Sequence, residues 1–256
     1  MAGHSHSSNI RFRKDRVDSK RAKAFAKLSR RITVAARQGG GSLDGNAKLR
    51  LCVEKARVAS MPKDAIERAI RKGTGAGELG SYEEILYEGY GPGGVALMIE
   101  ILTDNRHRTA ADVRALMEKF GGNLGASGSV AWMFERKGRF VVDPAPEEGA
   151  PPLDEARLLE VVLAVGADDF VVDDGATAIL CHPAAFADVN AALAAHRLSL
   201  RTAELAYVPT QRVLVSDEGV AIRLMRLIDA LEDNDDVQSL FSNEEFTGSV
   251  MKALED

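Results

Sequence analysis

Apolar residues recur at helical spacing through the first part of the chain. Between residues 19 and 37 they fall on one stripe of a helix, which is made of Phe25, Leu28, Ile32 and Ala35. Three consecutive glycines follow at 39–41, and glycine readily takes the left-handed conformation in which many helices end. The pattern therefore predicts a single helix over this stretch.

Two shorter helices are predicted before residue 73. Asn46 suits the N-cap of a helix over 47–59, because its side chain can accept a hydrogen bond from a free backbone N–H group. Pro62 suits the first turn of the next helix, where its missing N–H group would be unpaired anyway, and Gly73 ends that helix. We therefore expect a small all-helical unit over residues 19–72.

Beyond the glycine-rich segment 73–81 the period changes from helical to strand-like. "YEEILYEGY" and "VALMIEILT", residues 82–90 and 95–103, read as two strands joined by a Gly-Pro-Gly-Gly turn. A helix with Thr109 as its N-cap is predicted next. After it, "VAWMFER" at 130–136 is expected to form a strand.

From residue 139 onward the predicted order of elements is β-α-β-β-α-β, which is the order of the split ferredoxin-like unit. The strands are "RFVVD", "DFVVD", "TAILCH" and a stretch near 200–208. The helices lie near 154–165 and after Pro183. This unit alone would account for a compact α+β domain.

A last helix is predicted over 217–232 with Ser216 as its N-cap, followed by the strand "VQSLF". The segments before and after the ferredoxin-like unit are each incomplete, so the economical solution joins them into one domain. We therefore expect an α+β fold of three domains. Residues 1–78 are expected to form a basic arm and a helical nucleic-acid-binding domain. Residues 79–134 and 207–256 are expected to form a discontinuous α+β domain, and residues 135–206 a ferredoxin-like α+β domain inserted into it.

Charge is divided unevenly along the chain, although the whole protein has a formal net charge of −5. Residues 1–72 hold 19 Lys and Arg against 6 Asp and Glu, whereas the remaining 184 residues hold 14 against 32. Such a division concentrates positive potential in one region and indicates a polyanionic partner for it.

The basic residues form an arm, one helix face and a pair beside a later helix. We expect the arm and the helix face to bind the phosphate backbone of a nucleic acid, with a merely solvated surface as the alternative. A bound phosphate would also suit the arginines at the later helix N-terminus, where cations oppose the helix dipole. No helix pair has a clear helix-turn-helix turn with base-reading side chains. The candidate nucleic-acid-binding residues are Arg11, Arg13, Lys14, Lys20, Lys23, Lys27, Arg30, Arg31, Arg106 and Arg108.

Two glycine-rich motifs have alternative interpretations. "GYGPGG" at 89–94 satisfies G-x-G-x-x-G, but an apolar strand follows it where a dinucleotide site needs a helix, so a hairpin turn is favoured. "GGNLGASGS" at 121–129 lacks the lysine of a P-loop. It reads as a flexible or backbone-contacting loop, with a phosphate cradle as the alternative.

Other functional classes find little support. Motifs such as HExxH, paired CxxC or a nucleophile elbow are absent from the sequence. We therefore expect no enzymatic activity, catalytic residue, metal or cofactor, and an unrecognised cleft site is the remaining alternative. Cys52 and Cys181 stand alone among apolar residues, which is typical of reduced thiols in a cytoplasmic protein. No apolar run is long enough to span a membrane, and the oligomeric state stays open.

Taken together, these segments resemble the YebC/PmpR family, whose mitochondrial relative is a translational activator of cytochrome oxidase. The resemblance covers nearly the whole chain in order and spacing. The segments that carry it are "MAGHS", "NIRFRK", "DSKRAKAF", "ITVAARQGGG", "MPKDAIERAIRKG", "YEGYGPGG", "TDNRHRT", "GGNLGASGSVAWMF" and "EDNDDVQSLFSN".

The resemblance implies a helical N-terminal domain followed by two α+β domains. Members of the family are described as probable transcriptional regulators that bind DNA, and others act on the ribosome during translation of difficult stretches such as consecutive prolines. We therefore expect a nucleic-acid-binding regulator of gene expression with DNA or ribosomal RNA as partner. A ribosome-associated translation factor is the alternative. His6 and Ser7 stand where the family has a lysine and a tryptophan, which removes a base-stacking group from the arm.

Overall fold

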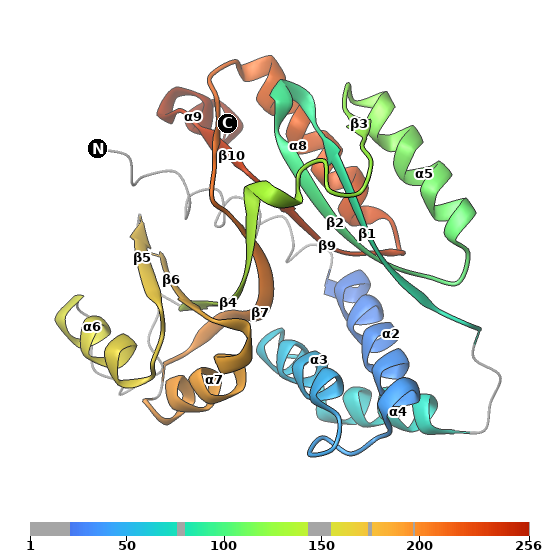
Figure 1. Ribbon diagram of the computed structural model, residues 1–256, viewed down its shortest axis with the longest axis vertical. Helices are drawn as coiled ribbons and strands as arrows, with labels where there is room; N and C mark the ends of the chain where they lie inside the picture. The colour runs from blue at the N-terminus through green and yellow to red at the C-terminus, as the bar shows by residue number, and fades with distance from the viewer. Residues whose placement is uncertain (1–20, 76–79, 143–154, 174–175, 197, 256) are drawn as a thin grey trace. The chain divides into compact units, whose positions relative to one another are not determined.

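The computed structural model describes residues 21–75, 80–142, 155–173, 176–196 and 198–255 (Figure 1). Two compact units are present, each built from separate stretches of the sequence. The first unit includes Leu28–Gly75 and Arg136–Ala206, and the second includes Arg16–Lys27, Ala76–Glu135 and Tyr207–Asp256. The chain is mixed helix and sheet with a helical N-terminal region, as the sequence predicts.

The helical region consists of α2 (Arg21–Gly39), α3 (Ala47–Val58) and α4 (Lys63–Thr74). Asn46 caps α3 as predicted, since its Oδ1 accepts a hydrogen bond from the Leu49 N–H group at 3.0 Å. Pro62 directly precedes α4. The last turn of α4 packs closely on α2, because a Cβ atom at Gly73 would collide with the carbonyl oxygen of Thr33.

The ferredoxin-like part of the first unit has the predicted order of elements. They are β4 (Phe134–Val142), α6 (Glu155–Ala164), β5 (Asp169–Asp173), β6 (Ala176–Cys181), η3 (Pro183–Ala185), α7 (Phe186–Ala195) and β7 (Leu200–Pro209). The strands lie in the order β5-β6-β4-β7, which is the arrangement of a ferredoxin-like sheet. Its core joins Phe140 and Ile179 of the sheet to Leu158 of α6 and Val189 of α7.

Helix α3 is attached to this sheet by apolar contacts and by a buried carboxylate. Leu51 and Val58 of α3 pack against the ferredoxin-like core. Lys55 Nζ donates to Glu204 Oε2 at 2.7 Å, and Arg139 Nη2 donates to Glu204 Oε1 at 2.6 Å. Burial alone would raise the pKa of Glu204, but the two cations hold it well below its usual range. The three charges therefore fix α3 on the sheet.

The second unit is built around a four-stranded sheet in the order β3-β1-β2-β9. Strands β1 (Glu83–Tyr90) and β2 (Ala96–Thr103) pair antiparallel on either side of η1 (Pro92–Gly94), so "GYGPGG" is a hairpin turn as predicted. Helices α5 and α8 contact one another beside this sheet (Figure 1). The other elements of the unit are α5 (Arg106–Lys119), β3 (Asn123–Leu124), η2 (Ala131–Met133), β8 (Val213–Val215), α8 (Glu218–Asp233), β9 (Val237–Ser242), β10 (Glu244–Phe246) and α9 (Gly248–Glu255).

Two helices begin at residues other than the predicted ones. Helix α5 starts three residues before Thr109, and its N-cap is Asn105, whose side chain accepts a hydrogen bond from the Arg108 N–H group. Helix α8 is capped by Asp217 in place of Ser216, because Asp217 Oδ1 accepts a hydrogen bond from Val220 at 2.7 Å. In both cases the capping side chain is the one that reaches a free N–H group in the first turn.

The strand predicted over 130–136 is wrong at its start. Ala131–Met133 forms η2, and one continuous strand, β4, replaces the two that were expected. The N–H groups of Val130 and Ala131 are bonded to the Glu88 side chain, so they are not available to a neighbouring strand. Strands β8 and β10 and helix α9 were not predicted at all. Across the residues that the structure describes, no helix has the length and apolar character needed to cross a membrane.

Candidate nucleic-acid interface

The start of the predicted basic face on α2 contacts acidic groups at the end of α8. Lys23 Nζ lies 3.5 Å from Asp233 Oδ1, and Lys27 Nζ donates to the carbonyl oxygen of Glu232. Burial lowers the pKa of Lys27 to about 8, although Glu232, Asp235 and Asp233 act in the opposite direction. Both lysines therefore have anionic surroundings within the second unit.

The rest of this face is less accessible than the sequence pattern indicates. Arg30 and Arg31 are half-buried, and each already has an interaction partner. Residues 32–36 are all buried, so this part of α2 is enclosed on every side, whereas residues 37–39 at its end are exposed. Among the predicted cations of this face that the structure describes, Lys23 is exposed and the others are half-buried. Lys20 and the predicted arm residues Arg11, Arg13 and Lys14 lie outside the described residues.

Exposed cations that were not predicted lie where the ends of the three helices approach one another. A Cβ atom at Gly73 would lie 3.2 Å from the backbone nitrogen of Arg37, so the last turns of α4 and α2 adjoin. Lys48 donates to Gln38 at 2.8 Å, which brings the start of α3 to the end of α2. A signal was available for Arg37, Arg71 and Lys72, because cations in the last turn of a helix are favoured by its dipole and are visible in sequence. The helix-end cluster consists of Arg37, Lys48, Arg71 and Lys72.

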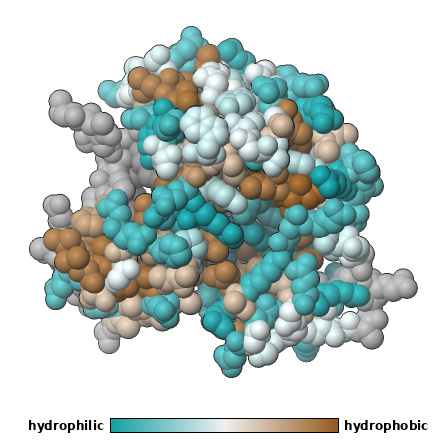
Figure 2. All heavy atoms as spheres, viewed as in Figure 1, coloured by the Kyte–Doolittle hydropathy of each residue, from teal (hydrophilic) through white to brown (hydrophobic). Residues whose placement is uncertain are grey.

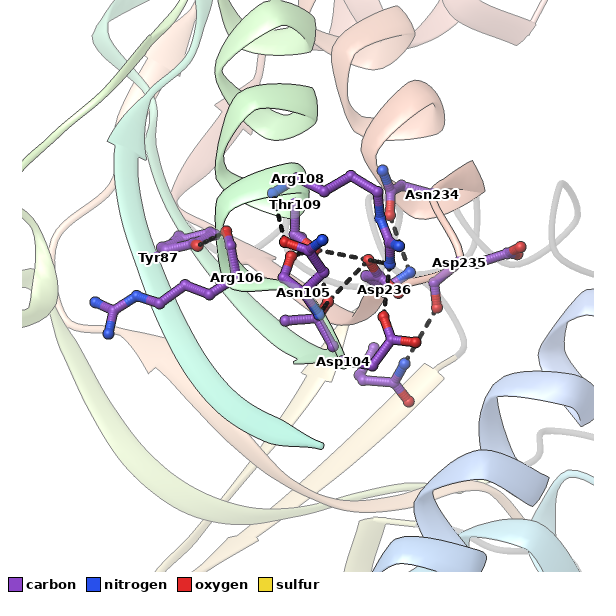
Figure 3. Close-up of polar contacts among 11 residues, drawn as sticks. Tyr87, Asp104, Asn105, Arg106, Arg108, Thr109, Asn234, Asp235 and Asp236 are labelled. Carbon is purple, nitrogen blue, oxygen red and sulfur yellow. Dashed lines mark hydrogen bonds and ion pairs between the residues drawn. The ribbon is translucent and has the colours of Figure 1, made fainter. Parts of the chain in front are cut away.

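Arg106 and Arg108 have different surroundings at the start of α5 (Figure 3). Arg108 Nη2 donates to Asp104 Oδ1 at 2.8 Å and lies 3.3 Å from Asp236 Oδ2. Hydrogen bonds to these two carboxylates raise the pKa of Arg108. The Arg106 side chain extends away from Asp236, on the side of Tyr87. Arg106 is therefore the better placed of the two to meet an external anion.

Asp236 joins the end of β2 and the start of α5 to the turn between α8 and β9. Its Oδ2 accepts hydrogen bonds from Thr109 at 2.7 Å and from Thr103 at 3.2 Å. Its N–H group donates to Asn234 Oδ1, and its carbonyl oxygen accepts from the Leu102 N–H group. Thr103 and Thr109 are completely buried. Internal carboxylates thus offset the cost of placing cations at the start of α5, and a bound phosphate is not required for this.

The glycine-rich loop 121–129 and the residues after it surround a carboxylate of the same chain. Glu88 of β1 is 4% exposed and accepts hydrogen bonds from Gly128 at 2.6 Å and from Val130 and Ala131 at 2.9 Å. Burial raises the pKa of Glu88, but these three hydrogen bonds outweigh it and the net pKa is lowered. The N–H groups of a possible phosphate cradle are therefore occupied by Glu88.

In the part of the chain that the structure describes, the thiols and acidic side chains give no indication of a metal site. Cys181 is buried, which raises its pKa to about 11, and Cys52 is half-buried. Neither cysteine is in a disulfide. Within the described ranges, no three His, Cys, Asp or Glu side chains are grouped so that they could hold a metal ion.

Known proteins of similar sequence cover this chain almost from end to end. Residues 5–76 match the TACO1/YebC protein N-terminal domain, and residues 82–244 match the TACO1/YebC second and third domain. A "Probable transcriptional regulatory protein" of Syntrophotalea carbinolica is 49% identical over 254 residues, which is 99% of each chain. A protein of the same name from Pseudomonas aeruginosa is 48% identical over 255 residues, covering 99% of this chain and 100% of the relative.

A solved structure has the same fold. The crystal structure of a conserved hypothetical protein from Aquifex aeolicus is similar with a TM-score of 0.79 and 42% sequence identity, covering 90% of this chain and 93% of that one. Together with the sequence matches, this confirms the resemblance drawn from the motifs. The chain belongs to the TACO1/YebC family.

Proposed function

We propose that this chain is a nucleic-acid-binding regulator of gene expression that meets its target through the N-terminal region. The observation that carries the proposal is the excess of 19 cations over 6 acids in residues 1–72, set against an acidic remainder. The exposed helix-end cluster adds a described surface on which such an excess is accessible. A surface of this kind attracts phosphates and releases their counterions on binding. We assign the protein no enzymatic activity.

The composition of the helical region supports contacts with phosphates more than contacts with base edges. Helices α2, α3 and α4 contain one amide side chain, Gln38, and it accepts a hydrogen bond from Lys48. Asn and Gln read adenine at base edges in the major groove, whereas contacts from lysine and arginine to phosphates fix position on the backbone without sequence information. We therefore infer binding with weak sequence preference.

The names of the relatives favour DNA as the target, since they are called probable transcriptional regulatory proteins. The scarcity of amide side chains in the helical region favours the second candidate, a ribosome-associated translation factor that recognises RNA by phosphate and shape. Arg106 would add a phosphate contact in either case. We keep Lys23 and the arm residues as further candidate phosphate contacts.

A competition titration beside a sucrose gradient separates the two candidates. We expect less than about tenfold preference for a candidate promoter duplex over a scrambled duplex at near-physiological salt, because specific binders usually exceed a thousandfold. We also expect the protein to co-sediment with ribosomes and to lose that association when residues 1–20 are deleted. A promoter preference of about a thousandfold or more without ribosome association would support the transcriptional alternative.

A further inference from the structure

Trp132 is the only tryptophan of the chain, and its side chain is on the surface of the second unit. The residue is 60% exposed, although tryptophan is usually among the most buried residues on average. Its Nε1 donates to the Ser129 carbonyl oxygen at 3.1 Å, so the one polar group of the indole is already bonded within the loop. What remains available to a ligand is the aromatic ring itself.

The backbone on both sides of Trp132 is fixed by hydrogen bonds. On the N-terminal side, Glu88 accepts from Gly128, Val130 and Ala131. On the C-terminal side, the carbonyl oxygen of Met133 accepts from Thr210 N at 2.8 Å and from Thr210 Oγ1 at 3.0 Å. The exposure of the ring is therefore not the result of a loose loop, and a buried carboxylate is used to hold the segment that presents it.

Exposed acidic side chains are scarce beside Trp132 in the chain. Residues 121–134 contain no charged residue, and residues 206–216, which include its hydrogen-bonded neighbour Thr210, contain only Arg212. This is unusual, because residues 73–256 as a whole contain 32 acidic and 14 basic residues. Glu88 is buried, and Glu135 is the nearest exposed acid to Trp132 in the sequence. Glycine and serine in the loop offer little apolar area to a protein partner.

We propose that the ring of Trp132 is a stacking platform for an unpaired base of a single-stranded nucleic acid. The proposal rests on the proposed nucleic-acid-binding function and adds a specific contact to it. An aromatic face recognises any base, because every base has a π-face, so the contact agrees with weak sequence preference. It also predicts a preference for single strands, since the bases of a duplex are already stacked on one another.

The test uses the fact that all tryptophan emission of this protein comes from position 132. The full chain is titrated with a single-stranded RNA of about 16 nucleotides, near the upper site size of single-strand binders. Binding is followed by the anisotropy of an end-labelled RNA, and stacking is followed by quenching of Trp132 emission with unlabelled RNA. We expect both signals to change over the same concentration range, and the same RNA annealed to its complement to quench less.

Three variants complete the experiment. Trp132→Leu should bind the single strand about tenfold more weakly, as expected for the loss of one stacked base, and Trp132→Phe should retain most of the affinity. Leu163→Ala is the matched control, because Leu163 is an equally accessible apolar residue at 72% exposure on α6, where apolar atoms gather in Figure 2. It should bind as the unmodified protein does.

The outcomes distinguish this proposal from the proposed function. RNA that binds by anisotropy while Trp132 emission stays constant would overturn the stacking contact and leave the function standing, as would Trp132→Leu with unchanged affinity. Absence of binding to both RNA and DNA would contradict the proposed function and the stacking contact together. The emission titration needs no substitution, so it remains decisive even if a variant does not fold.

Discussion

Glu88 is a carboxylate that takes the place of an anionic ligand in a glycine-rich loop. Replacing it by Gln removes the charge that three backbone N–H groups share. We expect Glu88→Gln to lower the free energy of unfolding by about 2 kcal/mol, since hydrogen bonds to charged groups each contribute about 1.5–3 kcal/mol. Glu83→Gln, at an exposed position of the same strand, should have little effect.

The lowered pKa of Glu88 gives this prediction a pH dependence. The stabilisation is present above the pKa of the unfolded state and is lost as the pH falls through the lower pKa of the folded state. The difference between the two proteins in urea unfolding should therefore shrink in acid. An equal difference at neutral and acidic pH would contradict the role given to the carboxylate.

Lys27 gives a pH dependence of the same sign at higher pH, although here burial disfavours the charged form. Its folded-state pKa of about 8 lies below the ordinary value of 10.5, so the unfolded chain binds more protons between these two values. Stability should therefore rise with pH over this window, by less than about 1.4 kcal/mol per pH unit for a single group. Urea unfolding should show the rise in the unmodified protein and in the exposed control Lys23→Met, but not in Lys27→Met. If stability still rises with pH in Lys27→Met, another titrating group is responsible for the rise.

Arg106 and Arg108 make a second matched pair at the residue scale. Arg108→Gln removes a hydrogen bond to Asp104 and an ion pair with Asp236, so it should lower the midpoint of thermal unfolding. Arg106→Gln should leave that midpoint unchanged and reduce the slope of log affinity against log salt by about 0.7 on a single strand. The reverse assignment, with Arg108 controlling affinity and Arg106 stability, would contradict the geometry of α5.

At the scale of elements, Glu204 connects α3 to strand β7. Glu204→Gln leaves Lys55 and Arg139 without their shared counter-ion, and we expect a loss of about 2–4 kcal/mol in unfolding free energy. Asp64→Asn is the control, because its pair with Arg68 lies on the surface and should contribute less than about 1 kcal/mol. Since the pKa of Glu204 is depressed, its contribution should disappear as the pH falls into the acid range. Equal losses in the two variants would contradict the account.

Local patterns predicted the elements whose causes are local. The cap at Asn46, the hairpin at 89–94 and the order of the ferredoxin-like unit follow from side chains and periods within a few residues of each element. The start of β4 could not be predicted in this way, because Val130 is bonded to Glu88, which lies 42 residues earlier. Helix α2 was predicted, but the burial of residues 32–36 depends on neighbouring helices.

The same limit applies to the candidate interface. The cations of α2 and α5 were visible in the sequence, and so was Asp104 beside Arg108, but the second carboxylate near Arg108 is that of Asp236, which lies 128 residues away. Arg37, Arg71 and Lys72 were equally visible in the last turns of their helices. They were missed because only the fold shows that these turns adjoin. A list of cations therefore indicates the kind of partner to expect, but not which surface is accessible to it.

Charge is divided unevenly along the whole molecule. The N-terminal 72 residues carry a formal charge of +13 and the remainder carries −18. Phosphate binding by the N-terminal region should therefore weaken steeply with salt, and neutralising cations there should matter more than neutralising as many elsewhere. If the affinity depended on total charge alone, neutralising the same number of cations in either region would weaken binding equally.

The most direct test compares two variants of equal charge by titrating a labelled single-stranded RNA over a range of salt concentrations. In one, Arg37, Lys48, Arg71 and Lys72 of the helix-end cluster are replaced by Gln, and in the other the exposed cations Lys119, Arg223, Arg226 and Lys252 of the second unit are replaced. We predict that the first variant binds more weakly at low salt and that its slope of log affinity against log salt is shallower by about 3, as four lost phosphate contacts require. The second should retain the affinity and slope of the unmodified protein. Identical behaviour of the two variants, or a helix-end variant that binds as tightly and with the same slope as the unmodified protein, would contradict binding through the N-terminal region.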